Sequence, residues 1–501
     1  MITIILITIL LALLIAYPLK KRTKLPPGPF PFPFLGNLPQ VGLLAAKHGG
    51  IVAAMKQLKK EYGPVFTIWL GPQPTVHIAT MDLAQETMVK RGGEFTQRWV
   101  PLLFNAVRKG LGIVGTSGDH WTEQRRFALH TLRNFGLGRS IMEERIMAEV
   151  NWRCESIDKE IGSKTVVMSP HDMFDLMVGS IINRMLFSEP LDGENGEEFH
   201  SLKRSIDKFV ENVSILDFFL NNEFAFKLPI LRTRYQKLTA PQRDLKAFIE
   251  KRVKERLFDI ESGSRVIPDE PEDYVDAFLL KMKQEEKESG PSSFNVPSLT
   301  INLFDLWIAG QETTVTTLIS GFAFLLNNLD VIEKIKEELL RVTKGERDLS
   351  LLDRPNTPYY NATITEIQRH ASILNINLFR RTEEDTYVGG FIVEKGTPLT
   401  AEISLLMSDE KFFKDDKFDP TRFLTNDKLD QHVTPFGMGK RSCPGESLAR
   451  AELYLIIGNM LLRYNIQPTE CLPATASKNN CGVLKRPSEY QMRIGKAEGR
   501  V

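Results

Sequence analysis

The chain has 501 residues and a net charge of +1, with 42% hydrophobic and 25% charged residues. This composition is that of a globular protein with a large core, and the near-neutral charge argues against a nucleic-acid-binding protein. The four cysteines (Cys154, Cys443, Cys471 and Cys481) form no C-x-x-C pair and no zinc spacing. They argue against a disulfide framework and favour a reducing compartment.

The chain begins with an uncharged apolar run, Ile2–Tyr17, followed by Lys20, Lys21, Arg22 and Lys24. As a helix this run would span about 24 Å, slightly less than a bilayer core of about 30 Å. A cleaved signal peptide would carry its positive charges before the run; a buried soluble helix is the other alternative. Because the basic residues should stay cytosolic, we predict an uncleaved transmembrane anchor over residues 1–19, with a lumenal N-terminus.

Residues 20–38 are basic and rich in proline, which excludes a helix and favours stiff, extended backbone. We expect a hinge here, although an ordinary proline-rich linker has the same composition. The remaining residues, 39–501, show no internal repeat and are predicted to form one large globular domain. Long helical patterns dominate it, so the expected fold is mainly α with small β-sheets.

Two short hairpins are predicted within this domain. Val65–Leu70 and Thr75–Ala79 are β-type runs joined by G-P-Q-P. Tyr387-Val388 and Phe391–Val393 flank the glycine pair at 389–390. The polar stretch Glu261–Thr300 is expected to form exposed connections around a short helix.

Leu299–Asn328 is apolar on nearly every face and contains no proline, which predicts a long helix buried in the core. At its middle, residues 309–314 read A-G-Q-E-T-T. A carboxylate and two hydroxyls inside a buried helix are costly without partners. They indicate either locally satisfied side chains or a functional site.

Three further patterns carry candidate chemistry. Trp121 and Arg125 are four residues apart and share a helix face, as do Glu366 and Arg369, three apart. Residues 436–445 read F-G-M-G-K-R-S-C-P-G and precede an apolar helical stretch. Cys443 therefore lies where a glycine-rich loop enters a helix, a position that should lower its thiol pKa and make it a thiolate metal ligand. A buried, inert cysteine is the alternative.

The loop matches F-x-x-G-x-R-x-C-x-G through Phe436, Gly439, Arg441, Cys443 and Gly445. It resembles the haem-binding loop of the cytochrome P450 superfamily. Similar motifs follow the family's order along nearly the whole chain: anchor, proline segment, W-x-x-x-R, A-G-x-E-T, E-x-x-R, R-F and cysteine loop. The resemblance implies a cytochrome P450 fold and haem b (iron protoporphyrin IX), with Cys443 as axial iron ligand.

The resemblance also assigns the residues around the haem. Those implied to hold its propionates are Trp121, Arg125, Arg98, Arg441 and Arg380, with Arg381 as an alternative to Arg380. A structural ion cluster is implied for Glu366, Arg369 and Arg422, where Thr421 replaces the family's usual glutamate and leaves the arginine in place. The A-G-x-E-T motif implies a locally opened helix with a groove for dioxygen, in which Thr313 donates a hydrogen bond and Glu312 relays protons.

The implied function is that of a microsomal, animal-type monooxygenase, with its catalytic domain facing the cytosol at the endoplasmic reticulum membrane. Its substrate would be a hydrophobic fatty acid, eicosanoid, steroid or xenobiotic. No G-x-G-x-x-G follows a strand, so electrons should come from NADPH through NADPH–cytochrome reductase, with cytochrome b5 as a possible second donor. Alternatives are a haem-thiolate isomerase or dehydratase acting on peroxides without dioxygen or NADPH, and a haem carrier or gas sensor.

Two surfaces are predicted by position alone. Exposed basic residues beside the cysteine loop could dock the reductase: Arg126, Arg133 and Lys440. The substrate pocket is expected to draw on Trp99–Thr116 (with Leu102, Leu103, Phe104 and Ile113), Ile206–Phe226, Phe304–Thr313 and Ser372–Phe379.

Overall fold

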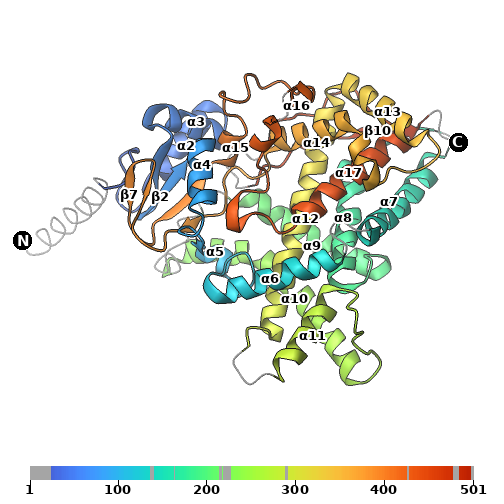
Figure 1. Cartoon of the computed structure of the whole chain (residues 1–501), viewed down its shortest axis with the longest axis horizontal. Coiled ribbons are helices and arrows are strands. Elements are labelled where there is room, and N and C mark those ends of the chain that lie inside the picture. Colours follow the sequence, from blue (N-terminus) through green and yellow to red (C-terminus); the bar gives the residue numbers. More distant parts are fainter. Residues whose placement is uncertain are drawn as a thin grey trace, which may run out of the picture.

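The structure is a computed structural model that describes residues 24–135, 140–162, 164–213, 217, 227–287, 292–425, 428–477 and 484–497. These residues form a mainly helical body; most of its strands lie toward the end marked N, whereas β10 (Met492–Lys496) lies toward the opposite end (Figure 1). The prediction of one large, mainly α domain with small β-sheets is confirmed. The predicted anchor lies outside the described residues, as do Cys481 and most of the stretch 214–226.

The helices of the described residues are α2 (Leu38–His48), α3 (Ile51–Tyr62), α4 (Met81–Gln85), η1 (Glu86–Lys90), α5 (Leu102–Asn105), α6 (Gly118–Asn134), α7 (Ser140–Ile161), α8 (Pro170–Phe187), α9 (Gly193–Asn212), α10 (Pro229–Glu261), α11 (Tyr274–Glu285), α12 (Val296–Leu326), α13 (Leu329–Thr343), η4 (Leu351–Asn356), α14 (Pro358–Ala371), α15 (Ile403–Leu406), α16 (Arg422–Thr425), η5 (Leu429–His432), η6 (Gly439–Arg441) and α17 (Glu446–Arg463). The strands are β1 (Val65–Leu70), β2 (Gln73–Ile78), β3 (Gln97–Arg98), β4 (Val166–Met168), β5 (Arg380–Arg381), β6 (Thr386–Val388), β7 (Phe391–Val393), β8 (Pro398–Ala401), β9 (Tyr464–Pro468) and β10 (Met492–Lys496).

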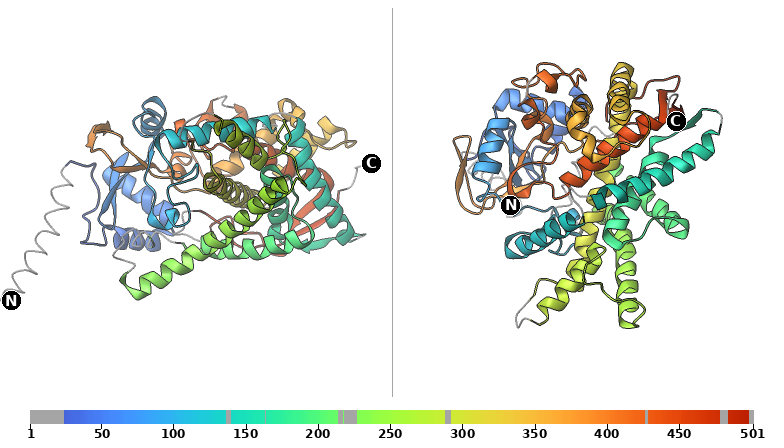
Figure 2. Two further views of the ribbon diagram at one scale, coloured as in Figure 1. Left: turned by 90° about the horizontal axis from the view of Figure 1, so that it is seen from below. Right: turned by 45° about the vertical axis from the view of Figure 1, so that its right-hand side comes forward.

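The long helix predicted at Leu299–Asn328 is α12, displaced by about one turn. It begins at Val296 because the Asn295 side chain accepts a 2.9 Å hydrogen bond from the Ser298 backbone N–H and a proline follows in the first turn. Most of its residues are buried, and it packs against α8, α10, α14 and α17. Figure 2 (left) draws it in the middle of the molecule with other elements around it. The expected local opening does not interrupt the helix.

Both predicted hairpins are confirmed. Strands β1 and β2 pair antiparallel, from Val65 opposite Ile78 to Leu70 opposite Gln73. They belong to a five-stranded sheet in the order β1-β2-β8-β5-β3, whose β2–β8 pairing is parallel. β6 and β7 are joined by Gly389 and Gly390, with φ of 58° and 86°. A positive φ at both central residues is what a tight two-residue hairpin turn requires.

The described part of the proline-rich segment lies against β1 instead of standing free. The Thr67 backbone N–H donates to the Pro27 carbonyl at 2.8 Å, and the Asn37 side chain accepts from the Trp69 N–H at 2.8 Å. A Cβ at Gly28 would lie 2.1 Å from the Thr67 carbonyl oxygen, so only glycine permits this approach. The proline composition gave no indication of this packing.

The stretch 261–300 contains α11 between exposed connections, as expected. Within the described residues, no single helix is long and apolar enough to cross a membrane; α12 and α13 together pass that test but are bent by 106°.

Candidate active site

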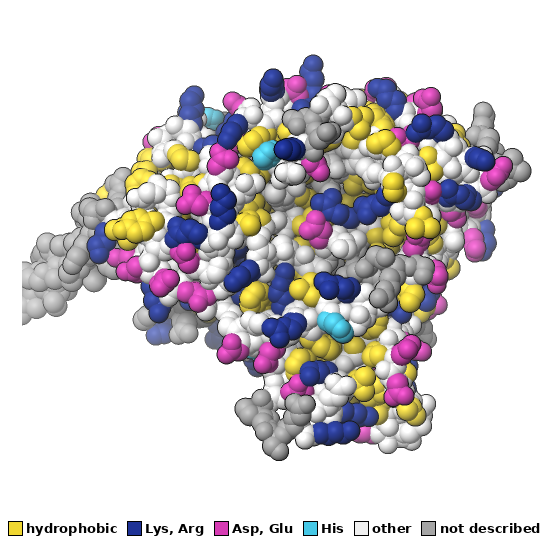
Figure 3. Space-filling view, in the orientation of Figure 1, with side chains coloured by type: hydrophobic (Ala, Val, Ile, Leu, Met, Phe, Trp, Pro, Cys, Tyr) yellow, Lys and Arg dark blue, Asp and Glu magenta, His cyan; other side chains and the backbone are white. Residues whose placement is uncertain are grey.

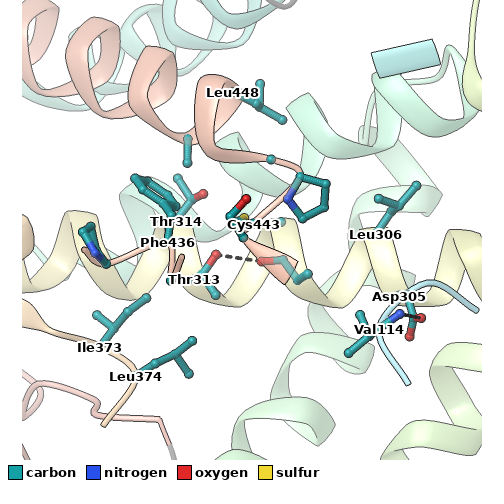
Figure 4. A pocket seen from close by; sticks show the side chains of 18 of the residues that line it. Val114, Asp305, Leu306, Thr313, Thr314, Ile373, Leu374, Phe436, Cys443 and Leu448 are labelled. Carbon is teal, nitrogen blue, oxygen red and sulfur yellow. Dashed lines mark hydrogen bonds between the residues drawn. The ribbon is translucent and has the colours of Figure 1, made fainter. Parts of the chain in front are cut away.

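A cavity of about 280 Å³ lies between α12 and the loop that enters α17. Thr313 borders it on α12, and Cys443 borders it on the loop. Figure 4 shows these side chains with Ile373 and Leu374, which come from the segment after α14. Two of the sequence motifs with candidate functional residues, 309–314 and 436–445, therefore border the same cavity.

The cysteine loop is held in shape by its backbone. The Cys443 N–H donates to the Phe436 carbonyl at 2.9 Å. Gly439 has φ of 72°, and a Cβ there would lie 1.8 Å from the Met88 carbonyl oxygen of η1. Glycine is thus required both for the left-handed turn and for the close approach of η1.

The prediction of a lowered thiol pKa was wrong for the free cysteine. The Cys443 thiol is open to the cavity but surrounded by protein, and this desolvation raises its pKa; the hydrogen bond from the Gly445 N–H offsets only part of the effect. The Glu446 carboxylate, at the start of α17, raises it further. Thiolate character must therefore come from a bound cation, because a coordinating thiol is deprotonated by its metal.

Four arginines converge beside the cavity from different elements. Arg98 and Arg380 face each other across β3 and β5, Arg125 comes from α6 and Arg441 from η6. The Arg441 guanidinium carbon lies 3.6 Å from the ring centroid of Trp121. Of the two alternatives on β5, Arg380 is fully buried, whereas Arg381 is exposed.

This arginine cluster is electrostatically uncompensated. Burial and the charges of Arg125 and Arg380 together lower the pKa of Arg441 to about 9. Burial and Arg125 likewise lower the pKa of Arg380 to about 10. These arginines donate to backbone carbonyls, as Arg125 does to Ser442 at 2.6 Å and Arg380 to Met438 at 2.7 Å. Buried N–H groups of Arg380, Arg441 and Trp121 have no hydrogen-bond partner among the described residues, so the cluster fits a bound anion.

The structure brings Glu366, Arg369 and Arg422 together. Arg369 donates two hydrogen bonds to the Glu366 carboxylate, at 2.7 and 2.9 Å, and Arg422 donates one at 3.1 Å. The Asp419 N–H also donates to it at 3.0 Å. Burial raises the pKa of Glu366, but Arg369, His370 and the Asp419 N–H together lower it to about 2. Thr421 is exposed and takes no part in the cluster.

Thr313 and Glu312 are neighbours on α12, but their side chains face different surroundings. Thr313 lines the cavity, and its hydroxyl donates to the Ala309 carbonyl at 2.7 Å. Glu312 is buried outside the residues that line the cavity and is ion-paired with Lys203, at 3.3 Å, and with Arg486. Consecutive helical residues lie about 100° apart around the axis, and here that rotation turns Glu312 toward Lys203 of α9 while Thr313 faces the cavity.

The family model for cytochrome P450 matches residues 26–494. The chain belongs to the cytochrome P450 family. Probable cytochrome P450 cyp-35D1 of Caenorhabditis elegans is 43% identical over 453 residues, which cover 89% of this chain and 90% of the relative. Cytochrome P450 2C23 of Rattus norvegicus is 32% identical over 479 residues (95% and 94%), and cytochrome P450 2C8 of Homo sapiens is 31% identical over 480 residues (94% of each).

This P450 is therefore a haem-thiolate monooxygenase. Its residues fit the haem that the family implies: a cysteine sulfur opens to the cavity, and unpartnered arginine and tryptophan N–H groups lie beside it. Two haem propionates would supply the anions that the arginine cluster lacks.

No pattern in the sequence predicted one internal ion pair of this P450. Arg108 donates to the Asp305 carboxylate at 2.7 Å, and its guanidinium lies 4.8 Å from the ring centroids of both Phe104 and Phe304. The second Asp305 oxygen accepts the N–H groups of residues 113 and 114, each at 2.9 Å. At the cavity wall, the pair holds the loop that precedes α6 against α12. The two residues are 197 apart in sequence, and no local pattern connects them.

Three of the four segments expected around the substrate contribute to the cavity. Trp99–Thr116 contributes Ile113, but its Leu102, Leu103 and Phe104 do not line it. Leu103 instead packs against Leu238 of α10, which draws α5 away. No described residue of the stretch 206–226 lines the cavity. Glu452 of α17, not predicted, does line it.

Proposed function

We propose that this P450 inserts one atom of dioxygen into a hydrophobic organic molecule, such as a fatty acid, eicosanoid, steroid or xenobiotic. The observation that carries the proposal is a single cavity that joins Cys443, the arginine cluster and Thr313. Its wall away from Cys443 is predominantly apolar: Ile113, Val114, Ile182, Leu306, Ala309, Ile373, Leu374 and Ile376. Such a wall favours an apolar substrate and excludes water from the reaction.

Each residue has a distinct proposed role. The haem, when bound, supplies the oxygen-activating chemistry at its iron. The Cys443 sulfur would hold the iron, and Arg98, Arg125, Arg380 and Arg441 would hold the propionates, with Trp121 donating its indole N–H. Glu366, Arg369 and Arg422 fix the end of α14 against α16, which is a structural role.

Proton delivery is proposed for two neighbours on α12. The Thr313 hydroxyl reaches the cavity after exchanging its hydrogen bond with Ala309 for one with a cavity molecule. Glu312 can pass a proton only when its carboxylate leaves Lys203 or Arg486. The side chain of Asp207, partly open to solvent, also pairs with Arg486 and offers that ion cluster a route outward.

Electrons are proposed to come from NADPH through NADPH–cytochrome reductase, with cytochrome b5 as an additional donor. Arg126, Arg133 and Lys440 are exposed around the cysteine loop, and no described carboxylate forms an ion pair with them. Reversing all three charges should lower reductase-supported turnover at least tenfold. Turnover driven by hydrogen peroxide, which needs no reductase, is the matched control. Equal losses in both assays would contradict docking at this surface.

We further propose location at the endoplasmic reticulum membrane, with the catalytic domain facing the cytosol. Large apolar side chains are exposed just after the segment that precedes residue 24: Phe30, Phe32, Phe34, Leu35 and Leu43. Figure 3 shows hydrophobic side chains on the surface at the left end of the described body. Such a patch is typical of a surface that contacts a membrane.

The deciding experiment supplies the purified P450 with reductase, NADPH, isotopically heavy dioxygen and a mixed pool of lipids and xenobiotics. Products that carry one heavy oxygen atom and require NADPH would establish monooxygenation and identify the substrate class. Products formed without NADPH, and without heavy oxygen, would instead indicate an isomerase or dehydratase.

A further inference from the structure

One polar side chain of the cavity wall belongs to none of the motifs and has no role so far. Asn377 lies in the segment between α14 and β5, and it lines the cavity together with Ile373, Leu374 and Ile376. Its amide nitrogen is buried and has no hydrogen-bond partner among the described residues. Because a buried amide N–H without an acceptor is costly, an acceptor from outside the chain is expected at this position.

The backbone of Asn377 is fixed by two hydrogen bonds to β8. Its N–H donates to the Ala401 carbonyl at 2.8 Å, and its carbonyl accepts from the Thr400 hydroxyl at 2.6 Å. Both partners are fully buried, and β8 pairs with β2 and β5 inside the five-stranded sheet. The side chain therefore projects from a rigid position, which is what a preorganised binding residue requires.

The amide of Asn377 lies against the cysteine loop at Gly437. A Cβ at Gly437 would be 3.0 Å from the Asn377 Oδ1 atom and 3.2 Å from its Nδ2 atom, which is closer than ordinary van der Waals contact. Gly437 also has φ of 69°, a conformation that favours glycine. The amide thus occupies the space that a side chain at residue 437 would fill, in the loop that carries Cys443.

Two arginines of the proposed propionate site contact the backbone on either side of this amide. Arg98 donates at 2.8 Å to the carbonyl of Leu378, the residue that follows Asn377. Arg380 donates at 2.7 Å to the carbonyl of Met438, the residue that follows the glycine of the loop. These arginines come from different strands, β3 and β5. Two independent contacts therefore place the unpartnered amide beside the arginine cluster.

We propose that Asn377 is a further cofactor-binding residue, whose side-chain amide donates a hydrogen bond to a haem propionate. A propionate oxygen is an acceptor that the amide lacks within the described chain. The amide is neutral, so it adds a donor without adding charge to four arginines that already repel one another. This inference rests on the propionate site proposed above, but not on which molecule the P450 oxidises.

The test measures the rate at which the holoenzyme loses haem to an excess of apomyoglobin. Asn377→Leu removes the amide at nearly constant volume, and haem should leave about tenfold faster or more, because a hydrogen bond to a charged group is lost. Asn377→Ala, which cannot clash, should give a similar increase. Asn375→Leu makes the same substitution on a side chain that lines a separate cavity, and the rate should stay near that of wild type. An unchanged rate in both Asn377 variants, or an equal increase in Asn375→Leu, would overturn the proposal.

A spectroscopic measurement separates a lost propionate contact from a general loosening of the fold. The propionate bending band of the resonance Raman spectrum should shift in Asn377→Leu and stay in place in Asn375→Leu. An unshifted band together with altered product distribution would place the amide against the substrate and overturn the proposal.

Arg380→Gln distinguishes failure of this inference from failure of the propionate site. If Arg380→Gln speeds haem loss and Asn377→Leu does not, the propionate site stands and Asn377 is removed from it. If neither variant speeds haem loss, both the propionate site and the role of Asn377 are overturned.

Discussion

The Thr314 hydroxyl donates a 3.1 Å hydrogen bond to the carboxyl group of Glu452. This contact joins α12, which carries Thr313, to α17, which follows Cys443. Thr314 and Glu452 both line the substrate cavity. The two walls of the active site are thereby linked by a buried polar contact, and its protonation state bears on the stability of the enzyme.

Glu452 should make stability depend on pH. Burial raises its pKa to about 8, and the hydrogen bond from Thr314 opposes that effect only in part. The native state therefore holds a proton that the unfolded chain releases above about pH 4.5, so stability falls as the pH rises from about 4.5 to 8. Glu452→Gln should remove this loss and gain stability relative to wild type, by a few kcal/mol at pH 8 but not at pH 5. Denaturant unfolding at both pH values measures this difference in the free energy of unfolding. An equal difference between the two proteins at pH 5 and pH 8 would contradict the prediction.

The two neighbouring arginines of β5 offer a matched pair for haem binding. Arg380 is fully buried, and two of its guanidinium nitrogens have no partner in the described part of the chain, whereas Arg381 is exposed. Arg380→Gln should lower haem content several-fold, because one hydrogen bond between charged groups contributes about 1.5–3 kcal/mol. Arg381→Gln should leave haem content near that of wild type. The ratio of Soret absorbance to protein absorbance measures both, and equal haem loss would remove Arg380 from the propionate site.

The Glu366 cluster should stabilise the fold in a pH-dependent way. Because the pKa of Glu366 is lowered to about 2, its contribution is fully present above about pH 4.5 and is lost as the pH falls toward 2. Glu366→Gln removes the carboxylate that pairs with Arg369 and Arg422 and should lower the free energy of unfolding by about 3–5 kcal/mol at pH 7.

The control for that variant is Asp415→Asn. Asp415 pairs with the same Arg422 at 3.0 Å, but it is exposed to solvent. Its loss should lower the free energy of unfolding far less than the loss of Glu366 does, because solvent screens a surface ion pair. Chemical denaturation of the holoenzymes compares the two, and similar losses would show that burial of Glu366 is not what matters.

The hydroxyl of Thr313 should act on turnover and leave folding nearly unchanged. Thr313→Val removes the hydroxyl at nearly constant volume, and product formation should fall at least tenfold, since a positioned proton donor typically contributes about 10²–10⁴ in rate. Thr313→Ser keeps the hydroxyl and should restore most of the rate. Thr317→Val removes a hydroxyl that lines the same cavity but is bonded to the Thr313 carbonyl at 2.8 Å. If that control variant lost as much activity, Thr313 would have no special part in proton delivery.

Local spacing explains which features could be predicted from sequence. Glu366 and Arg369 share one helical turn, and the left-handed glycines of the cysteine loop lie next to Cys443, so short motifs carry these contacts. The hairpin at Gly389-Gly390 has an equally local cause.

Contacts between distant segments could not be predicted. Arg486 and Glu312 are 174 residues apart, and Arg108 and Asp305 are 197 apart. No spacing rule connects such pairs, because their meeting depends on the packing of several helices. The same reason explains why the pKa of Cys443 could not be predicted: desolvation by distant segments raises it more than the local hydrogen bond from Gly445 lowers it.

The ion cluster around Glu312 allows its two proposed properties, stability and proton delivery, to be separated. At pH 7 it contains two cations, Lys203 and Arg486, and three carboxylates: Glu312, Asp175 and Asp207. Burial lowers the pKa of Lys203, but the three carboxylates together raise it to about 12. Lys203→Met would leave three carboxylates with a single cation and should cost about 3–5 kcal/mol. Glu312→Gln leaves two cations with two carboxylates and should lower the free energy of unfolding by only about 1–2 kcal/mol.

Because Glu312→Gln should remain folded, its turnover reports on chemistry and not on stability. We expect a lower rate of product formation and a larger solvent deuterium isotope effect than in wild type, since proton transfer would then limit the reaction. The comparison variant is Asp175→Asn, which also removes one carboxylate from the cluster but lies on α8, one side chain farther from Thr313. An unchanged isotope effect in Glu312→Gln, or an equal increase in both variants, would assign Glu312 to holding α9 against α12 and remove it from proton delivery.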